Sequence, residues 1–261
     1  MHTQKKSLSI LNKTIQQFPK QLLILGSGWN EVLAESKIEH EITYKELFDV
    51  EATVPGHQGK LVIAKVGGVR VAVMVGRFHM YEGYSALQAT LPIRVFAEAG
   101  VKQMLVTAAS GALHEKYKVG EFVILNDLLT LFLSLDNPLV GPKFLDCSEV
   151  FDPQLRQHLL AAVHKHNIPF QQGCYAYYHG PNFETPADKM ALKKLGADVA
   201  GMSTVPETLM ARWHGIEVAG VALVTNLAFV KHDHKEVLAQ AHKASKRMVK
   251  LIKEFVVATK G

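Results

Sequence analysis

The stretch "GRFHMYEGYS", residues 76–85, contains four side chains that could bind a ligand or take part in catalysis within six positions: Arg77, His79, Tyr81 and Glu82. It directly follows "VRVAVMV", an alternating apolar run that predicts a β-strand. Arginine and histidine both donate hydrogen bonds to oxyanions, and the planar guanidinium does so through a rigid fork of N–H groups. The interpretation without a functional role is a surface ion pair for Arg77 and a structural role for His79. The functional interpretation is an anion site at the mouth of a sheet.

Small or polar residues recur where the predicted strands end. In α/β sheets the ligand crevice lies beyond the carboxyl ends of the strands, and small residues there let backbone N–H groups approach an anion. His57, in the glycine-flanked loop "VPGHQGKL", is either a further donor or an ordinary loop histidine. Neither GxGxxG nor GxxxxGK[ST] is present, so the usual dinucleotide and triphosphate sites are not supported. The strand-end residues are Gly26-Ser27-Gly28, Gly76-Arg77, Ala108-Ala109-Ser110-Gly111, Met202-Ser203 and Thr225-Asn226.

The segment "HGPNFETPAD" sets Phe183 beside Glu184 just before a predicted helix. An acid near the start of a helix is usually favoured by the helix dipole, which is the simplest interpretation of Glu184. The alternative is a base site, in which Glu184 accepts a hydrogen bond from the N–H edge of a base and Phe183 stacks on it. The sequence lacks HExxH, and HxH pairs alone are weak evidence for a metal. We therefore expect neither a metal nor a cofactor.

The elements that must position these residues alternate along the chain as strand and helix. This alternation predicts an α/β fold around a mixed sheet covered by helices on both faces. "KLVIAKVGGVRVAVMV" predicts a hairpin around Gly67-Gly68. Helices are expected from the "GSG" turn through about Ser36, over residues 85–100 with a bend at Pro92, and from about Lys235 to the end.

The apolar residues of the first 20 positions recur at helical spacing and predict a docked amphipathic helix. They are Leu8, Leu11, Ile15 and Phe18. We find no repeat at a fixed period and no convincing linker. We therefore expect one domain over residues 1–261, with residues 1–20 as an N-terminal helical extension.

Composition narrows the class of protein. The chain is 48% hydrophobic and 20% charged, and its apolar runs are far shorter than the roughly 20 residues that cross a bilayer. There is no signal-peptide pattern, and the two cysteines form no CxxC motif, so a cytoplasmic protein without a membrane partner is expected. The net charge of +5 raises nucleic-acid binding as a possibility, but the basic residues are dispersed. The lysines near the end belong to the polar face of a helix whose buried stripe is Ala244, Met248, Leu251 and Ile252.

Six motifs occur together in an order and spacing that resemble one family. They are "LGSG", "VPGHQGKL", "GRFHMYEGY", "GPNFET", "LGADVAGMSTVPE" and "TN". From about residue 20 to the end, the chain resembles the trimeric, low-molecular-mass purine nucleoside phosphorylases of the nucleoside phosphorylase superfamily. The resemblance implies a mixed β-sheet forming a distorted barrel flanked by helices. It also implies a homotrimer that converts a purine (deoxy)nucleoside and phosphate into free base and (deoxy)ribose 1-phosphate, with phosphate as co-substrate and no cofactor.

The resemblance also implies roles for individual residues. The phosphate site falls on Ser27, His57, Arg77, His79, Ser203 and the backbone N–H of Ala109. The ribose site falls on Tyr81, Met202, His234 (with His232 as its competitor) and Phe144 from a neighbouring subunit, and the base site on Phe183, Glu184 and Asn226. Asn226, Glu184 and His79 would act in catalysis. Glu184 would accept from a purine N1–H, which adenine lacks, so 6-oxopurine nucleosides such as inosine, guanosine or xanthosine are the expected substrates.

The chain departs from the family pattern at several of these positions. Ala108 stands where the family usually has Asn, Ser110 where it has Ala, and Trp29-Asn30 where Leu-Gly is common. Two alternatives therefore stay open. One is an enzyme like methylthioadenosine phosphorylase, against which Asn226 argues because that enzyme would offer Asp. The other is a catalytically impaired protein that binds purine nucleosides.

Overall fold

The computed structural model describes residues 1–51, 53–54, 58–131, 136–227, 230 and 234–260, of which residues 234–236 contribute backbone only. The strands are β1 Gln21–Leu25, β2 Lys37–Thr43, β3 Lys60–Val66, β4 Val69–Val75, β5 Gln103–Ala112, β6 Phe122–Leu129, β7 Phe170–Tyr177, β8 Val199–Gly201 and β9 Glu217–Leu227. The α-helices are α1 Gln4–Thr14, α2 Tyr44–Phe48, α3 Ala86–Ala89, α4 Leu91–Glu98, α5 Pro153–Lys165, α6 Pro186–Lys194, α7 Val205–Trp213 and α8 His234–Ala258. Two short 3₁₀ helices, η1 Asn30–Leu33 and η2 Met80–Glu82, complete the described elements.

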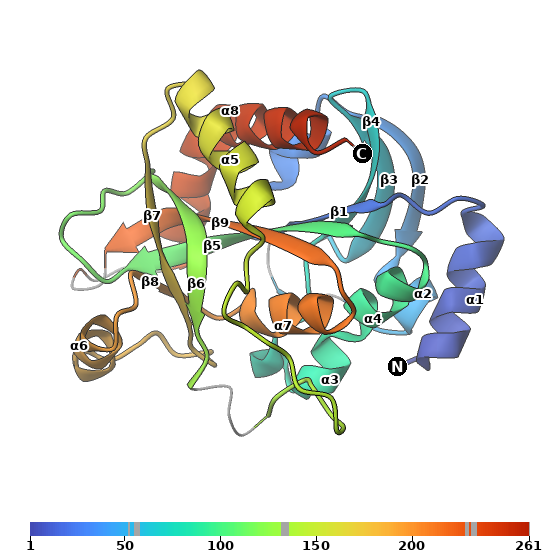
Figure 1. The fold of residues 1–261 in the computed structure, drawn as a ribbon, viewed down its shortest axis with the longest axis horizontal. Coiled ribbons are helices and arrows are strands. Elements are labelled where there is room, and N and C mark those ends of the chain that lie inside the picture. The colour runs from blue at the N-terminus through green and yellow to red at the C-terminus, as the bar shows by residue number, and fades with distance from the viewer. Residues whose placement is uncertain (52, 55–57, 132–135, 228–229, 231–233, 261) are drawn as a thin grey trace.

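The strands form one mixed sheet in the order β2-β3-β4-β1-β5-β8-β7-β6-β9. A further pairing between β5 and β9 closes the last five strands of this order into a barrel (Figure 1). β4, β1, β5 and β9 are parallel neighbours, so their carboxyl ends meet at one edge. This arrangement confirms the predicted fold class, a mixed sheet in the form of a distorted barrel flanked by helices, and gathers the predicted strand-end residues on one side of the molecule.

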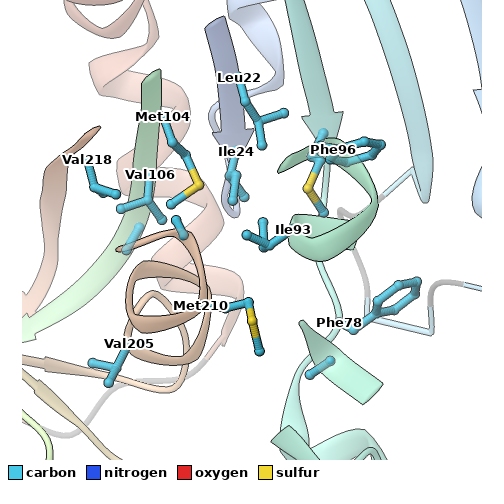
Figure 2. Packing of buried hydrophobic residues seen from close by; sticks show 14 of the residues in the cluster. Leu22, Ile24, Phe78, Ile93, Phe96, Met104, Val106, Val205, Met210 and Val218 are labelled. Carbon is cyan, nitrogen blue, oxygen red and sulfur yellow. The ribbon is translucent and has the colours of Figure 1, made fainter. Parts of the chain in front are cut away.

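Two hydrophobic layers hold this sheet in place. One face packs against α5 and α8, and Ala244, Met248, Leu251 and Ile252 are fully buried there, as the sequence predicts. Figure 2 shows the other face, where strand residues such as Leu22 and Val106 meet α4 and α7. Each large apolar side chain buried in this way contributes about 1.5–3 kcal/mol to folding. Among the described residues, no helix is both long enough and apolar enough to span a membrane.

The hairpin prediction is confirmed. β3 and β4 pair antiparallel up to Val66 and Val69. Gly67 and Gly68 form the two-residue turn with φ of 57° and 82°. Both angles lie in the left-handed region, where glycine carries no steric penalty, and a turn with two such residues matches the twist of the strands.

Several local predictions are wrong. The segment after "GSG" is not a helix through Ser36, because Trp29 turns into the core with 0% exposure and only the single turn η1 forms before β2 begins at Lys37. The helix expected over residues 85–100 divides at Thr90, which ends α3 and caps α4, with Pro92 in the first turn of α4. The N-terminal helix ends at Thr14, so Ile15 and Phe18 pack on the core from beyond its end.

Candidate active site

A cavity of about 120 Å³ opens at the edge where the carboxyl ends of the parallel strands meet. Among the residues that line it are most of those predicted to bind phosphate, sugar or base. The lining residues are Gly26, Ser27, Arg77, His79, Tyr81, Ala108, Ala109, Ser110, Gly111, Phe183, Glu184, Ala200, Gly201, Met202, Ser203, Thr225, Asn226 and Val237. The sequence separation of these residues is large, and the fold brings them together.

Arg77 follows β4 and is held from two sides. Its Nη2 donates to the carbonyl oxygen of Thr107, and its Nη1 lies 3.3 Å from Oε1 of Glu207 on α7. The side chains of this ion pair are only 2% and 5% exposed. Gly26 makes the close approach possible, because a Cβ there would lie 2.8 Å from the Thr107 oxygen and 3.4 Å from Nη2. The arginine is therefore fixed at the cavity wall with its counter-charge behind it.

His79 is similarly supported by a carboxylate. Its Nδ1 lies 3.0 Å from Oε1 of Glu82, and the same oxygen accepts the His79 backbone N–H at 2.8 Å. Burial lowers the pKa of His79, and the hydrogen bond to Glu82 opposes this only in part. Burial also acts on Glu82, but hydrogen bonds from His79 and Thr53 outweigh it and lower the pKa of that carboxyl. At neutral pH the imidazole is thus neutral, with Nδ1–H donating to an ionised Glu82 and Nε2 in the acceptor form.

Tyr81 lies against this pair at the cavity wall. Its ring stacks on the His79 ring with centroids 4.6 Å apart and planes 16° from parallel. Burial raises the pKa of Tyr81 to about 12, so the phenol stays protonated and can donate a hydrogen bond.

Ser203 sits between β8 and α7, and Tyr175 of β7 holds it. The Tyr175 hydroxyl accepts the Ser203 backbone N–H and lies 3.4 Å from the Ser203 hydroxyl. Gly201 leaves the room for this contact, since a Cβ there would lie 2.2 Å from the Tyr175 oxygen. Thr204 follows with φ of 71°, an unusual conformation for a β-branched residue. This turn brings Ser203 to the cavity directly before the amino end of α7, where anions are favoured.

A second group of residues in the same cavity has the chemistry of a base site. Phe183 is 41% exposed, and its aromatic ring can stack on a flat base. Glu184 stands one residue before Thr185, the N-cap of α6, whose capping box uses Asp188. The capping hydrogen bonds of this helix are thus made by other side chains, and Glu184 lines the cavity instead. The side-chain amide of Asn226 also lines the cavity, and its Oδ1 accepts a hydrogen bond from the Thr225 hydroxyl at 3.0 Å.

A family model of the phosphorylase superfamily matches residues 20–257. The chain belongs to this superfamily. It is 35% identical to purine nucleoside phosphorylase 1 of Bacillus subtilis, over 97% of each chain, and 36% identical to the purine nucleoside phosphorylase of Bos taurus, over 91% of this chain and 88% of the relative. It also superposes on isoform 2 of purine nucleoside phosphorylase from Schistosoma mansoni with a TM-score of 0.89, at 34% identity and with coverage of 98% and 96%. The predicted family resemblance is confirmed.

Among the described residues, the cavity wall contains only part of the set that the phosphorylase resemblance implies. His57 and His232 lie outside the described residues, and of His234 only the backbone at the start of α8 is described. Val237, one turn further along that helix, does line the cavity. Phe144 is 96% exposed and is not among the lining residues. Its predicted role on a neighbouring subunit stays a prediction.

The segment "TAASGALH" contains two residues that differ from the family pattern, Ala108 and Ser110. Both line the cavity. Trp29 does not: its indole Nε1 donates to the carbonyl oxygen of Ala108, and its ring packs edge-on against Phe122. In this chain the tryptophan therefore supports the cavity from behind.

The sequence does not reveal the roles of the residues that hold the donors in place. Glu82, Glu207 and Thr225 lie inside the quoted motifs "GRFHMYEGY", "LGADVAGMSTVPE" and "TN", but residue type alone does not show that they support other side chains, and Tyr175 lies in no motif. The useful signal would have been the presence of carboxylates within apolar surroundings, since a buried carboxylate needs a partner. Among the described residues, no group of three or more His, Cys, Asp or Glu side chains has the arrangement of a metal site.

Proposed function

We propose that this protein catalyses the reversible phosphorolysis of purine (deoxy)nucleosides, yielding a free base and (deoxy)ribose 1-phosphate. The observation that carries the proposal is that one cavity contains both oxyanion donors and a base-binding set. Arg77 and Ser203 supply the donors, neutral His79 lies beside them as a proton acceptor, and Phe183 and Glu184 belong to the base set. Relatives named purine nucleoside phosphorylase support the assignment, as do solved structures of the Schistosoma mansoni enzyme in complex with inosine and of a Schistosoma enzyme with guanosine.

Phosphate bound by Arg77, Ser203, Ser27 and the backbone N–H of Ala109 attacks the anomeric carbon of the sugar. The bond from this carbon to N9 of the purine breaks, the base leaves with the electron pair, and a phosphate oxygen forms the new bond. The transition state carries positive charge on the sugar and negative charge on the base. A fixed phosphate supplies both the nucleophile and the counter-charge for the sugar, without the entropic cost of bringing it there. Neutral His79 suits this role because its Nε2 can accept a proton from the phosphate.

The sugar and base are bound by the rest of the cavity. Tyr81 and Met202 contact the ribose, with His234 near its 5′-hydroxyl. Phe183 stacks on the base, and Asn226 hydrogen-bonds the base at O6 and N7. Glu184 accepts from N1–H, so a 6-oxopurine satisfies its carboxylate and adenine does not. We therefore propose inosine, guanosine or xanthosine as the substrate class.

The family resemblance also suggests an oligomeric state for this protein, and the sequence suggests a cellular compartment. We propose a homotrimer in which Phe144 of one subunit closes the sugar site of the next. Phe144 and Val140, which are 96% and 73% exposed, would gain an apolar covering in that assembly. We further propose that residues 1–261 act as one domain in the cytoplasm, with residues 1–20 as its helical extension, and that the reaction needs no metal or cofactor besides phosphate. Light scattering of the purified protein tests the trimer.

Incubation of the protein with inosine, with and without phosphate, tests the function. Hypoxanthine released only with phosphate, together with an equal amount of ribose 1-phosphate, supports the proposal. Release without phosphate would indicate a hydrolase, and binding without turnover would indicate an impaired nucleoside-binding protein. The same assay with guanosine, xanthosine, adenosine and methylthioadenosine tests the substrate class, since preference for an adenine nucleoside would favour the methylthioadenosine phosphorylase alternative.

A further inference from the structure

β9 contains an irregularity beside the cavity. It pairs with β5 in continuous parallel register as far as Val224 opposite Ser110, but the next pair is Asn226 opposite Gly111. Thr225 is therefore an extra residue, and the pairing has the form of a β-bulge. Bulges are rare in parallel pairs, and near functional sites they redirect a side chain that regular alternation would point elsewhere. Here the bulge precedes Asn226, whose side chain lines the cavity.

The Thr225 side chain is 3% exposed, and its hydroxyl has two acceptors within reach. They are Oδ1 of Asn226 at 3.0 Å and the carbonyl oxygen of Ser110 at 3.3 Å. A hydroxyl carries one proton, and the shorter contact is to Asn226. The other end of that amide lies over Gly111, where a Cβ would come within 2.8 Å of Nδ2. The oxygen of the amide is thus directed to Thr225 and the nitrogen to the gap that Gly111 leaves.

We propose that Thr225 is a positioning residue that fixes the orientation of the Asn226 amide and thereby selects purines with a carbonyl group at C6. The inference rests on the proposed function. With Oδ1 engaged by Thr225, Asn226 offers N–H donors to the ligand. N7 and O6 of a 6-oxopurine are both acceptors and match these donors. The 6-amino group of adenine is a donor, so it would face another donor and leave both unpaired.

The test compares kcat/KM for inosine and for adenosine at saturating phosphate. Thr225→Val keeps the shape of the side chain and removes the hydroxyl, and Thr225→Ala is a second hydroxyl-free variant should valine prevent folding. Both are expected to lower kcat/KM for inosine about tenfold with little change for adenosine, so the preference ratio falls about tenfold. Thr225→Ser restores the hydroxyl and should keep the ratio within about threefold of the parent. Thr208→Val removes another fully buried hydroxyl, on α7 away from the cavity lining, and should leave the ratio unchanged.

The proposal is overturned if the hydroxyl-free variants lower kcat/KM equally for inosine and adenosine, because that is the effect of a packing defect. It is also overturned if Thr225→Ser loses the preference as fully as Thr225→Val. These outcomes differ from failure of the proposed function, in which the parent protein itself shows no phosphate-dependent cleavage of any purine nucleoside.

Discussion

The ion pair between Arg77 and Glu207 yields the most quantitative prediction. Arg77→Ala leaves the Glu207 carboxylate, whose side chain is 5% exposed, without its cation. Removing one partner of a buried pair costs about 3–5 kcal/mol. For a domain of this size each kcal/mol shifts the unfolding temperature by about 2–4 °C, so a decrease of about 6–20 °C is expected. Loss of activity in this variant would therefore mix a damaged site with a damaged fold.

A double variant separates the two effects. Arg77→Met combined with Glu207→Met replaces both charged side chains with apolar ones of similar volume, and such a replacement of a whole buried pair is often close to neutral in stability. The double variant should regain most of the unfolding temperature that Arg77→Ala loses. It should still fail to bind phosphate, because the arginine donor is gone.

Thermal unfolding with and without phosphate measures both quantities. At a phosphate concentration of about 100 times Kd, the parent protein gains about 2.7 kcal/mol of stability, and the double variant should gain nothing at the same concentration. If Arg77→Ala unfolds at the parent temperature, the buried pair does not stabilise the fold as argued. If phosphate stabilises the double variant as much as the parent, Arg77 is not the phosphate donor.

Three further predictions concern other residues of the cavity. Glu184→Gln should lower kcat/KM for inosine about 10- to 100-fold, because a charged acceptor is lost, and should leave kcat/KM for adenosine unchanged. Equal losses of kcat/KM for the two nucleosides would contradict the base-site role. Sulfate keeps its charge between about pH 5.5 and 8 and favours a protonated His79, whose pKa is lowered by burial in the free protein. The Kd for sulfate, measured by calorimetry, should therefore decrease as the pH falls and should not depend on pH in His79→Gln. An equally steep pH dependence in His79→Gln would assign the proton to another group. Gly111→Ala should displace the Asn226 amide, because its Cβ would lie 2.8 Å from Nδ2, and lower inosine turnover with a shift of only a few degrees in unfolding temperature; unchanged turnover would show that the amide position is not required.

Much of the fold can be predicted from the sequence because its signals are local. The apolar runs of β1, β4, β5 and β9 are strong strand patterns, and parallel strands bring their carboxyl ends to one edge whatever the details of the turns. The residues at those strand ends are therefore good candidates for a binding site on the strength of the sequence alone.

The features that the sequence mispredicted or did not reveal depend on tertiary contacts. "WNEVLAES" has the composition of a helix, but burial of Trp29 against Phe122 and pairing of β2 with β3 leave room for one tight turn only. The pair of Arg77 and Glu207 joins segments far apart in the sequence, and no local pattern announces it. The bulge at Thr225 is a matter of register between two strands, which residue types alone do not determine.

A crystal structure of the protein with phosphate and hypoxanthine would show whether one cavity holds an oxyanion and a purine next to each other. We expect phosphate within hydrogen-bond distance of Arg77 and Ser203, and in the same cavity a base stacked on Phe183 with its N1–H directed at Glu184. Phosphate bound at another surface, or a base bound away from Glu184 and Asn226, would contradict it.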